Sequence, residues 1–466
     1  MRLVIEVKKD IMQQENNKYR DLIRISENAT EHGMDAILNE FFFFCTFLKG
    51  LPSQDFLYRR LVGRPYSKHA LWKAIQGSAK GFARTLLRSV LNGPLSNRQI
   101  ISGKIARTTD ILIITWLHDA DILLKNRIDK EDRYFGGLGA AIKDQGYHVQ
   151  YLLTPVTRQV AKNSLTSLGL HNNLIIDSNN VRPSSRDLAS SRNSIRNSFS
   201  FDMRIDERVS CITGFLSLRY IESSQLLAIL SDQFLKSNLG HIIIPWEGQP
   251  EQKAVCLAAH AAGIKVWGYC HAAFNASYAN LINNNWAWCP DIMLTSGLGY
   301  VPLLEDMGWK NKTCLIRSLR YSQPPAKTTF EGKIFLPYDI KDSINTLKIL
   351  KSMVFDGSCT VKEIRCHPDN LKHPEIRALI NIIPTNTDAA GVYVGGFTSV
   401  LFEALQAGCT VYNIQTDILN SEDDYNKFNK IRITRLNQFL LKFEPIGDMK
   451  DYFFCFDEDR SFKLSG

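Results

Sequence analysis

Residues 241–271 read HIIIPWEGQPEQKAVCLAAHAAGIKVWGYCH. The apolar run 241–245 predicts a buried strand, and the small residues of 250–262 predict a helix that Gly263 ends. A second apolar run, 264–269, predicts another strand. This order of strand, helix and strand is the unit from which parallel α/β sheets are built.

Polar side chains follow both strands of this unit. Glu247 and Gln249 come after the first strand, and His271 comes after the second. Ligands bind beyond the carboxyl ends of strands in parallel sheets, so these three residues are candidates for a functional site. Glu247 fits a general base or a nucleophile, and it equally fits a cap or an ion pair for the helix that follows. The same two interpretations apply to His271.

The alternation of strands and helices continues on both sides of this stretch, which predicts an α/β protein with parallel sheets. The expected strands are 110–116, 147–153, 173–176, 241–245, 264–269, 291–295, 313–316, 333–336, 360–366, 391–394 and 409–414. The expected helices are 133–144, 219–235, 250–262, 342–354, 374–380 and 400–407.

The chain has 466 residues, which is too many for one ordinary core. We therefore expect two Rossmann-like domains facing a cleft, at residues 106–305 and 306–440. Residues 1–105 are expected to be mostly helical, because apolar residues recur there at helical spacing. Residues 441–466 form an aromatic tail that is expected to pack as a helix or to cross back. Residues 179–208 are rich in Ser, Arg and Asn and predict a long loop.

The net charge of +9 is concentrated in residues 80–107 and 182–208. Each basic cluster is either a solvated surface or the contact for an anionic partner. No nucleic-acid motif is present, which leaves a membrane surface or an anionic ligand as the partner. The longest apolar run is too short to span a bilayer, and no signal peptide opens the chain. We expect a cytoplasmic protein with peripheral contact at the inner face of the cytoplasmic membrane.

The metal-ligand residue types do not form a recognisable metal site in the sequence. The ten cysteines show neither CxxC pairs nor metal-ligand spacing, so they are expected to be reduced core thiols. His118, Asp119 and Asp121 are ligand types within one loop, but such a loop after a strand is ordinary. No metal is predicted.

A glycine-rich turn precedes the helix expected at 400–407. Gly395 and Gly396 allow a close backbone approach, and Thr398 and Ser399 stand at the helix N-terminus, where N–H groups and the helix dipole attract an anion. The alternative is plain N-capping, for which Ser and Thr are favoured. Glu403 lies in the same stretch and is grouped with these candidate phosphate-binding residues.

His367 and Pro368 follow the strand expected at 360–366. Pro368 keeps the backbone of His367 extended. An imidazole beside an anion is protonated, so His367 could neutralise a leaving phosphate or protonate it. The alternative is a structural histidine.

Taken together, these motifs resemble those of bacterial sialyltransferases. An acidic residue with Gly, a His-Pro pair and a Ser/Thr motif occur in this order in those GT-B enzymes, which use CMP-activated sugars. The phrases PWEGQPEQKAV…GYCH and GGFTSVLFEALQAG look still closer to bacterial surface-carbohydrate transferases that handle CMP-linked ulosonic acids, such as Kdo or sialic-acid-like sugars. The resemblance covers about residues 106–415. One departure is that Trp-Glu-Gly replaces the paired acids, so the base rests on Glu247 alone.

The resemblance implies a metal-independent transferase without a cofactor, whose CMP-sugar donor delivers an acidic sugar to a surface-glycan or lipid-linked acceptor, as in lipopolysaccharide or capsule synthesis. It assigns base catalysis to Glu247 and phosphate contacts to His367, Thr398 and Ser399. The sugar carboxylate would bind one of three arginines, and two further side chains would contact substrate. These weaker candidates are Arg317, Arg320 and Arg365, together with Gln249 and His271. The alternatives are a GT-B transferase using a nucleotide diphosphate sugar or a CDP-polyol, and a non-catalytic scaffold in glycan assembly.

Overall fold

The computed structural model describes residues 101–117, 128–155, 173–176, 218–274, 288–321, 323–337, 340–367, 370–396, 398–416 and 422–464, with Ala83 and Leu281. The expectations for the helical region before residue 101, for His118, Asp119 and Asp121, for the loop 179–208 and for Pro368 lie outside the described residues. The chain divides into two compact units. The described residues of the first unit are those up to Tyr269 with 281, 288–293 and 307–312, and the rest belong to the second.

The first sheet is mainly parallel and contains the strands that the opening stretch predicts. Its strand order is β1 (Ile101–Ser102), β4 (Leu174–Ile176), β3 (Val149–Pro155), β2 (Ile111–Leu117), β5 (His241–Pro245), β6 (Lys265–Cys270), β7 (Ile292–Thr295) and β8 (Thr313–Leu315). Strands β5 and β6 pair in parallel from His241 with Lys265 to Pro245 with Tyr269. Only the short β1 pairs antiparallel, with β4, among the pairings of β1–β6.

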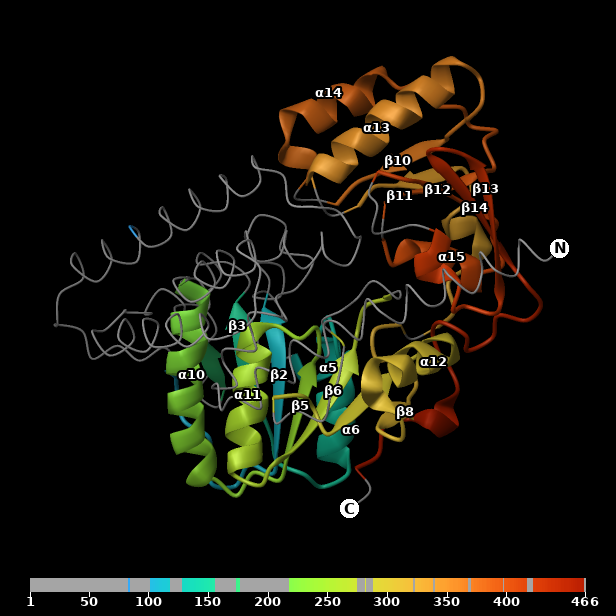
Figure 1. Cartoon of the computed structure of the whole chain (residues 1–466). Coiled ribbons are helices and arrows are strands. Elements are labelled where there is room, and N and C mark those ends of the chain that lie inside the picture. Colours follow the sequence, from blue (N-terminus) through green and yellow to red (C-terminus); the bar gives the residue numbers. More distant parts are fainter. Residues whose placement is uncertain are drawn as a thin grey trace, which may run out of the picture. The chain divides into compact units, whose positions relative to one another are not determined.

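Helices cover this sheet because its strands are apolar on both faces. Strand β2 (ILIITWL) is buried along almost its whole length, as strands covered on both faces are. Helices α10 (Leu218–Leu235) and α11 (Pro250–Ala261) pack side by side against each other (Figure 1). The shorter helices are α5 (Ile128–Glu131) and α6 (Leu138–Asp144) in the first unit and α12 (Val301–Leu304) in the second.

The helix expected at 133–144 begins only at Leu138, because residues 132–137 form a turn. The carboxylate of Asp132 accepts hydrogen bonds from the N–H groups of Tyr134 and Phe135 at 2.7 and 2.8 Å. Gly136 has φ 52°, a left-handed conformation that favours glycine. The glycines at 136 and 137 therefore build the turn before α6.

The second sheet has the order β10 (Glu363–Arg365), β9 (Lys333–Phe335), β11 (Val392–Gly395), β12 (Val411–Ile414), β14 (Leu440–Pro445) and β13 (Ile431–Asn437). Its first four strands are parallel. Helices α13 (Ile340–Phe355) and α14 (Pro374–Ile382) pack together beside it, and α15 (Val400–Gln406) connects β11 to β12 (Figure 1). Two α/β units with parallel-dominated sheets confirm the expected Rossmann-like fold class.

The sequence did not predict the hairpin formed by β13 and β14. Strand β14 pairs antiparallel with β12 and with β13, so the first residues of the expected tail, 441–445, belong to the sheet. Strand β13 is exposed along most of its length, as the edge strand of a sheet can be. Its apolar and polar residues alternate only over 431–434, which is a short signal for a strand.

After β14 the tail packs back within the second unit as an irregular segment. The N–H groups of Leu298 and Gly299 donate to the carbonyls of Asp451 and Tyr452 at 3.0 and 2.7 Å. A Cβ on Gly299 would lie 2.8 Å from the ring of Tyr452, so this position needs a glycine. The tail contact is thus a close backbone approach that only a residue without a side chain allows.

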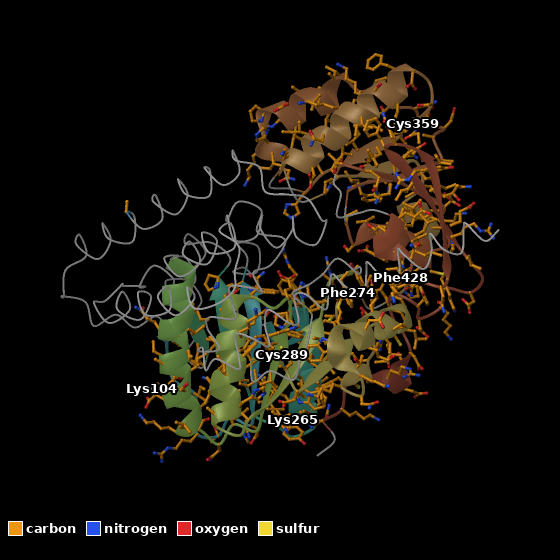
Figure 2. The ribbon with its side chains drawn as sticks, in the orientation of Figure 1. Lys104, Lys265, Phe274, Cys289, Cys359 and Phe428 are labelled. Atoms are coloured by element: carbon orange, nitrogen blue, oxygen red, sulfur yellow. The ribbon has the colours of Figure 1, made fainter. Side chains whose placement is uncertain are left out.

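An aromatic cluster joins the tail to α15. Phe274 stacks on Tyr300 with ring centroids 4.6 Å apart, and Phe428 meets Tyr300 edge-on at 5.9 Å (both phenylalanines are labelled in Figure 2). Phe402 of α15 and Phe453 of the tail contact each other at 4.8 Å in the same cluster. Burial in this cluster raises the pKa of Tyr300 well above its ordinary value.

Short helical turns complete the described structure. Turns of 3-10 type lie at Leu298–Tyr300, Lys327–Thr329, Asn370–Lys372, Glu422–Tyr425 and Glu458–Arg460, and a π turn lies at Glu305–Trp309. No helix within the described parts of the chain is both long and apolar enough to cross a membrane.

Candidate functional site

Glu247 lies in a tight, hydrogen-bonded loop between β5 and α11. The loop starts from Trp246, which is 2% exposed and whose N–H donates to the carbonyl of Tyr269 at 2.8 Å. Gly248 has φ 66°, which reverses the chain after Glu247. Glu247 itself is half-buried, at the carboxyl end of β5 where the sequence places it.

Two glutamines hold this loop. Gln252 accepts hydrogen bonds from the N–H groups of Glu247 and Gln249 at 2.9 and 3.0 Å, and it donates to the carbonyl of Pro245. Gln249 donates from Nε2 to Oε2 of Glu247 at 3.3 Å. Gln249 thus contacts the candidate base directly, whereas the sequence suggested contact with substrate. Gln252 was not singled out from the sequence, although a glutamine three residues after the N-cap residue Gln249 is the spacing of a capping box.

A small, partly open cavity, with room for about one water molecule, lies in the first unit near the carboxyl ends of β2, β3 and β5. It is mostly apolar, and the polar residues in its lining include Thr115, Thr154, Glu251 and Gln252. Residues Ile114, Trp116 and Ile244 share one face of the sheet in the observed register and line the same cavity. Gln252 therefore stands between this cavity and the Glu247 loop.

His271 follows β6 and is 8% exposed. The residue belongs to the second unit by its contacts, together with the following residues up to Phe274. A contact between His271 and substrate stays a prediction.

In the second unit, the turn between β11 and α15 contains three of the candidate phosphate-binding residues, and Gly395 ends the strand before it. Gly396 has φ 52°, and its N–H donates to Ile414 at 2.9 Å. The hydroxyl of Thr398 accepts from the N–H of Val400 at 3.4 Å. Ser399 occupies the N-cap position in a helical conformation, and its side chain makes no capping hydrogen bond. Capping therefore explains Thr398 in part and does not explain the hydroxyl of Ser399.

Gly395 is explained by packing. A Cβ at this position would lie 2.5 Å from Cγ2 of Thr346 and closer still to its Oγ1. Thr346 belongs to α13 and is fully buried. The absence of a side chain at Gly395 thus lets α13 pack against β11.

Glu403 is anchored by a residue that the sequence did not single out. The hydroxyl of Tyr321 donates to Oε1 of Glu403 at 2.7 Å. The ring of Tyr321 also meets Phe454 of the tail edge-on, with centroids 5.0 Å apart. The tail and Tyr321 together fix the orientation of α15.

His367 is exposed just beyond β10, at the same sheet edge as the glycine turn. Its carbonyl accepts from the N–H of Asn370 at 2.9 Å, which turns the chain toward α14. In the order β10, β9, β11 the ends of the two outer strands are two strand spacings apart, roughly 10 Å. His367 and the glycine turn therefore lie on one sheet edge, with the end of β9 between them.

The three candidate arginines differ in their surroundings. Arg317 lies 3.6 Å from Glu458, and Nε of Arg365 lies 2.7 Å from Glu363. Arg320 is exposed, and its guanidinium lies 5.3 Å from the ring centre of Tyr321. The chain from Arg320 through Tyr321 to Glu403 links this arginine to α15.

The described residues include a buried thiol, Cys289, and residue types that can bind metals. Burial raises the pKa of Cys289 to about 12, so this thiol stays protonated. Within the described ranges, no group of three or more His, Cys, Asp or Glu side chains could hold a metal ion.

The chain is similar in structure to a known protein at low sequence identity. No protein-family model matches the chain, and no curated protein does. Among solved structures, the crystal structure of Arabidopsis thaliana UGT89C1 is similar with 13% identity and a TM-score of 0.35, over 67% of this chain and 80% of that one.

Proposed function

We propose that the chain is a glycosyltransferase that moves an acidic sugar, Kdo or a sialic-acid-like nonulosonic acid, from a CMP-activated donor to a bacterial surface glycan. The observation that carries the proposal is a pair of strand-end arrangements, one in each unit. The first unit holds the carboxylate of Glu247 in a hydrogen-bonded loop. The second places His367 and the Thr398–Ser399 turn along one sheet edge.

The chemistry divides between these two arrangements. Glu247 accepts the proton of the acceptor hydroxyl as the new glycosidic bond forms. The bond between the sugar and the phosphate breaks, and its electron pair leaves on the phosphate oxygen of CMP. His367 and the hydroxyls of Thr398 and Ser399 stabilise the charge on this leaving group.

Arg320 is the arginine that best fits the carboxylate of the donor sugar. Arg317 and Arg365 each lie beside a glutamate, whereas Arg320 stacks near Tyr321 beside the helix that follows the phosphate turn. A guanidinium binds a carboxylate through two parallel hydrogen bonds, which gives specificity for acidic sugars.

Calorimetry with CMP, CDP and UDP on the full chain tests the donor assignment. We expect CMP to bind most tightly, and tighter binding of UDP would point to a nucleotide diphosphate sugar instead. Thr398→Val should weaken CMP binding, whereas Thr398→Ser keeps the hydroxyl and should retain it. Equal CMP affinity in both variants would remove the phosphate role from this turn.

Glu247→Gln tests catalysis separately from binding. The variant should keep its affinity for CMP and lose sugar transfer, because the amide cannot accept the proton. A protein that binds no nucleotide would favour the scaffold alternative. The proposed acceptor is a glycan or lipid-linked glycan at the inner face of the cytoplasmic membrane, and salt-sensitive binding to anionic vesicles tests that location.

A further inference from the structure

Gln252 uses its whole side-chain amide to organise the Glu247 loop. The residue is 2% exposed and lies in the first turn of α11. Its Oε1 accepts from Glu247 and Gln249 at 2.9 and 3.0 Å, and its Nε2 donates to Pro245. These three contacts fix the backbone on both sides of Glu247.

Gln249 connects the loop that Gln252 holds to the carboxylate of Glu247. Its side chain is nearly buried, at 6% exposed, and its Nε2 donates to Oε2 of Glu247 at 3.3 Å. The left-handed Gly248 between them brings the two side chains onto the same side of the loop. Gln252 therefore holds the backbone of Gln249, and the side chain of Gln249 donates to the carboxylate of Glu247.

We propose that Gln252 is a positioning residue for Glu247, acting through the loop backbone and Gln249. The inference rests on the proposed function for the role of Glu247 as a base. A base must be both ionised and oriented, and a donor to a carboxylate favours its ionised form. Gln252 does not act on substrate itself.

The direct test is the titration of the Glu247 carboxyl in the full chain, followed by carbon NMR with glutamate labelled at the carboxyl carbon. The signal is assigned by its loss in Glu247→Gln. Gln249→Leu removes the donor and Gln252→Met removes its anchor, so each should raise the pKa of Glu247, by about half a unit to one unit. The double variant should shift no further than either single one, because both act on the same hydrogen bond.

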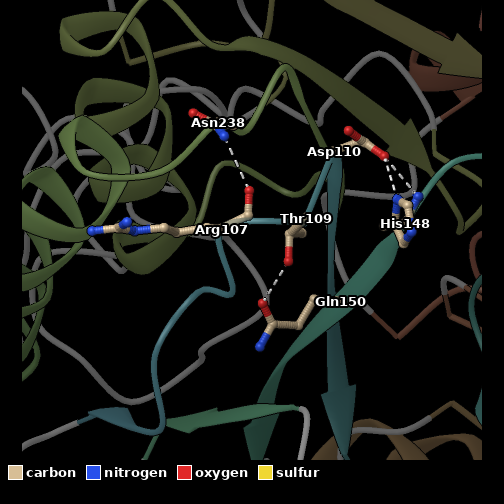
Figure 3. A network of polar contacts seen from close by, with 6 residues as sticks. All are labelled: Arg107, Thr109, Asp110, His148, Gln150 and Asn238. Carbon is tan, nitrogen blue, oxygen red and sulfur yellow. Dashed lines mark hydrogen bonds and ion pairs between the residues drawn. The ribbon is translucent and has the colours of Figure 1, made fainter.

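Gln150 provides a matched control in the same unit. Its Oε1 accepts from the N–H of Ala106 at 3.1 Å and from the hydroxyl of Thr109 at 3.0 Å, and its Nε2 donates to the carbonyl of Lys104 at 3.1 Å. Figure 3 shows its contact with Thr109. Gln150 thus ties down a loop just as Gln252 does, but at the amino end of the sheet. Gln150→Met should destabilise the fold and leave the titration of Glu247 unchanged.

The outcomes separate positioning from mere stability. An unchanged Glu247 titration in folded Gln252→Met, or an equal shift in Gln150→Met, would overturn the proposal. Should Gln252→Met not fold, Gln252→Asn keeps the amide but shortens its reach, and the same shift is expected. Affinity for CMP should be unaffected in all these variants. Failure of CMP to bind the wild type would count against the proposed function, whereas failure of the Glu247 shift would count against positioning alone.

Discussion

Gly395→Ala should destabilise the second unit through a single packing contact. The new Cβ would stand 2.5 Å from Cγ2 of Thr346, where van der Waals contact needs well over 3 Å. Thr346 is fully buried on α13, so neither the helix nor the strand can move without disturbing the core. Overpacking of this kind costs about 1–3 kcal/mol of the free energy of unfolding.

The assay is urea-induced unfolding. The midpoint is compared among the wild type, Gly395→Ala and the double variant Gly395→Ala/Thr346→Ala. Removing Oγ1 and Cγ2 of Thr346 relieves the two closest contacts, so the double variant should recover much of the lost stability. Any loss of CMP binding in Gly395→Ala should also be reversed in the double variant, because the structure explains the glycine by its packing against Thr346. An unchanged midpoint in Gly395→Ala would refute the reasoning. A double variant that is stable but no longer binds CMP would instead show that the phosphate approaches Gly395 itself.

Three further outcomes are expected. Tyr321→Phe removes the hydrogen bond to Glu403 and should lower the free energy of unfolding by about 1 kcal/mol, measured by urea denaturation. Arg320→Gln should weaken binding of CMP-N-acetylneuraminic acid while leaving CMP binding unchanged, measured by calorimetry; equal losses for both ligands would contradict a carboxylate role. Burial raises the pKa of Asp291, but hydrogen bonds from His260 and from the backbone of β6 outweigh it and hold the pKa below its ordinary value. Because the folded pKa is depressed, the stabilisation is present above the unfolded pKa of about 4 and is lost as pH falls through the folded value. Asp291→Asn should therefore be less stable than wild type at neutral pH, and the gap should close in acid; a gap independent of pH would exclude this origin.

Local sequence patterns predicted the elements whose burial is set by their own residues. Strand β5, helix α11 and strand β6 appear where the apolar runs and Gly263 place them. Such strands are covered on both faces, so nearly every residue is apolar and the pattern is unmistakable. The edge strand β13 carries no such pattern, and it exists because β14 offers it hydrogen-bonding partners.

The candidate site residues stay predictions. Glu247, His367 and Thr398 could be singled out because strand ends are marked by the abrupt loss of apolar residues. Gln252 was missed although its contacts are local and follow the spacing of a capping box. Tyr321 was missed because its role lies in a contact to a distant segment. Tyr321 and Glu403, for instance, are 82 residues apart along the chain.

The sequence by itself determined the two α/β units and the polar residues at their strand ends, because burial and turn formation depend on neighbouring residues. The tertiary structure alone decided what those residues contact. Gly395 accommodates a threonine of α13, and Glu403 accepts a hydrogen bond from Tyr321. Such contacts form where segments that are distant in the sequence meet in the fold. The short-range periodicity of the sequence does not predict where those segments meet.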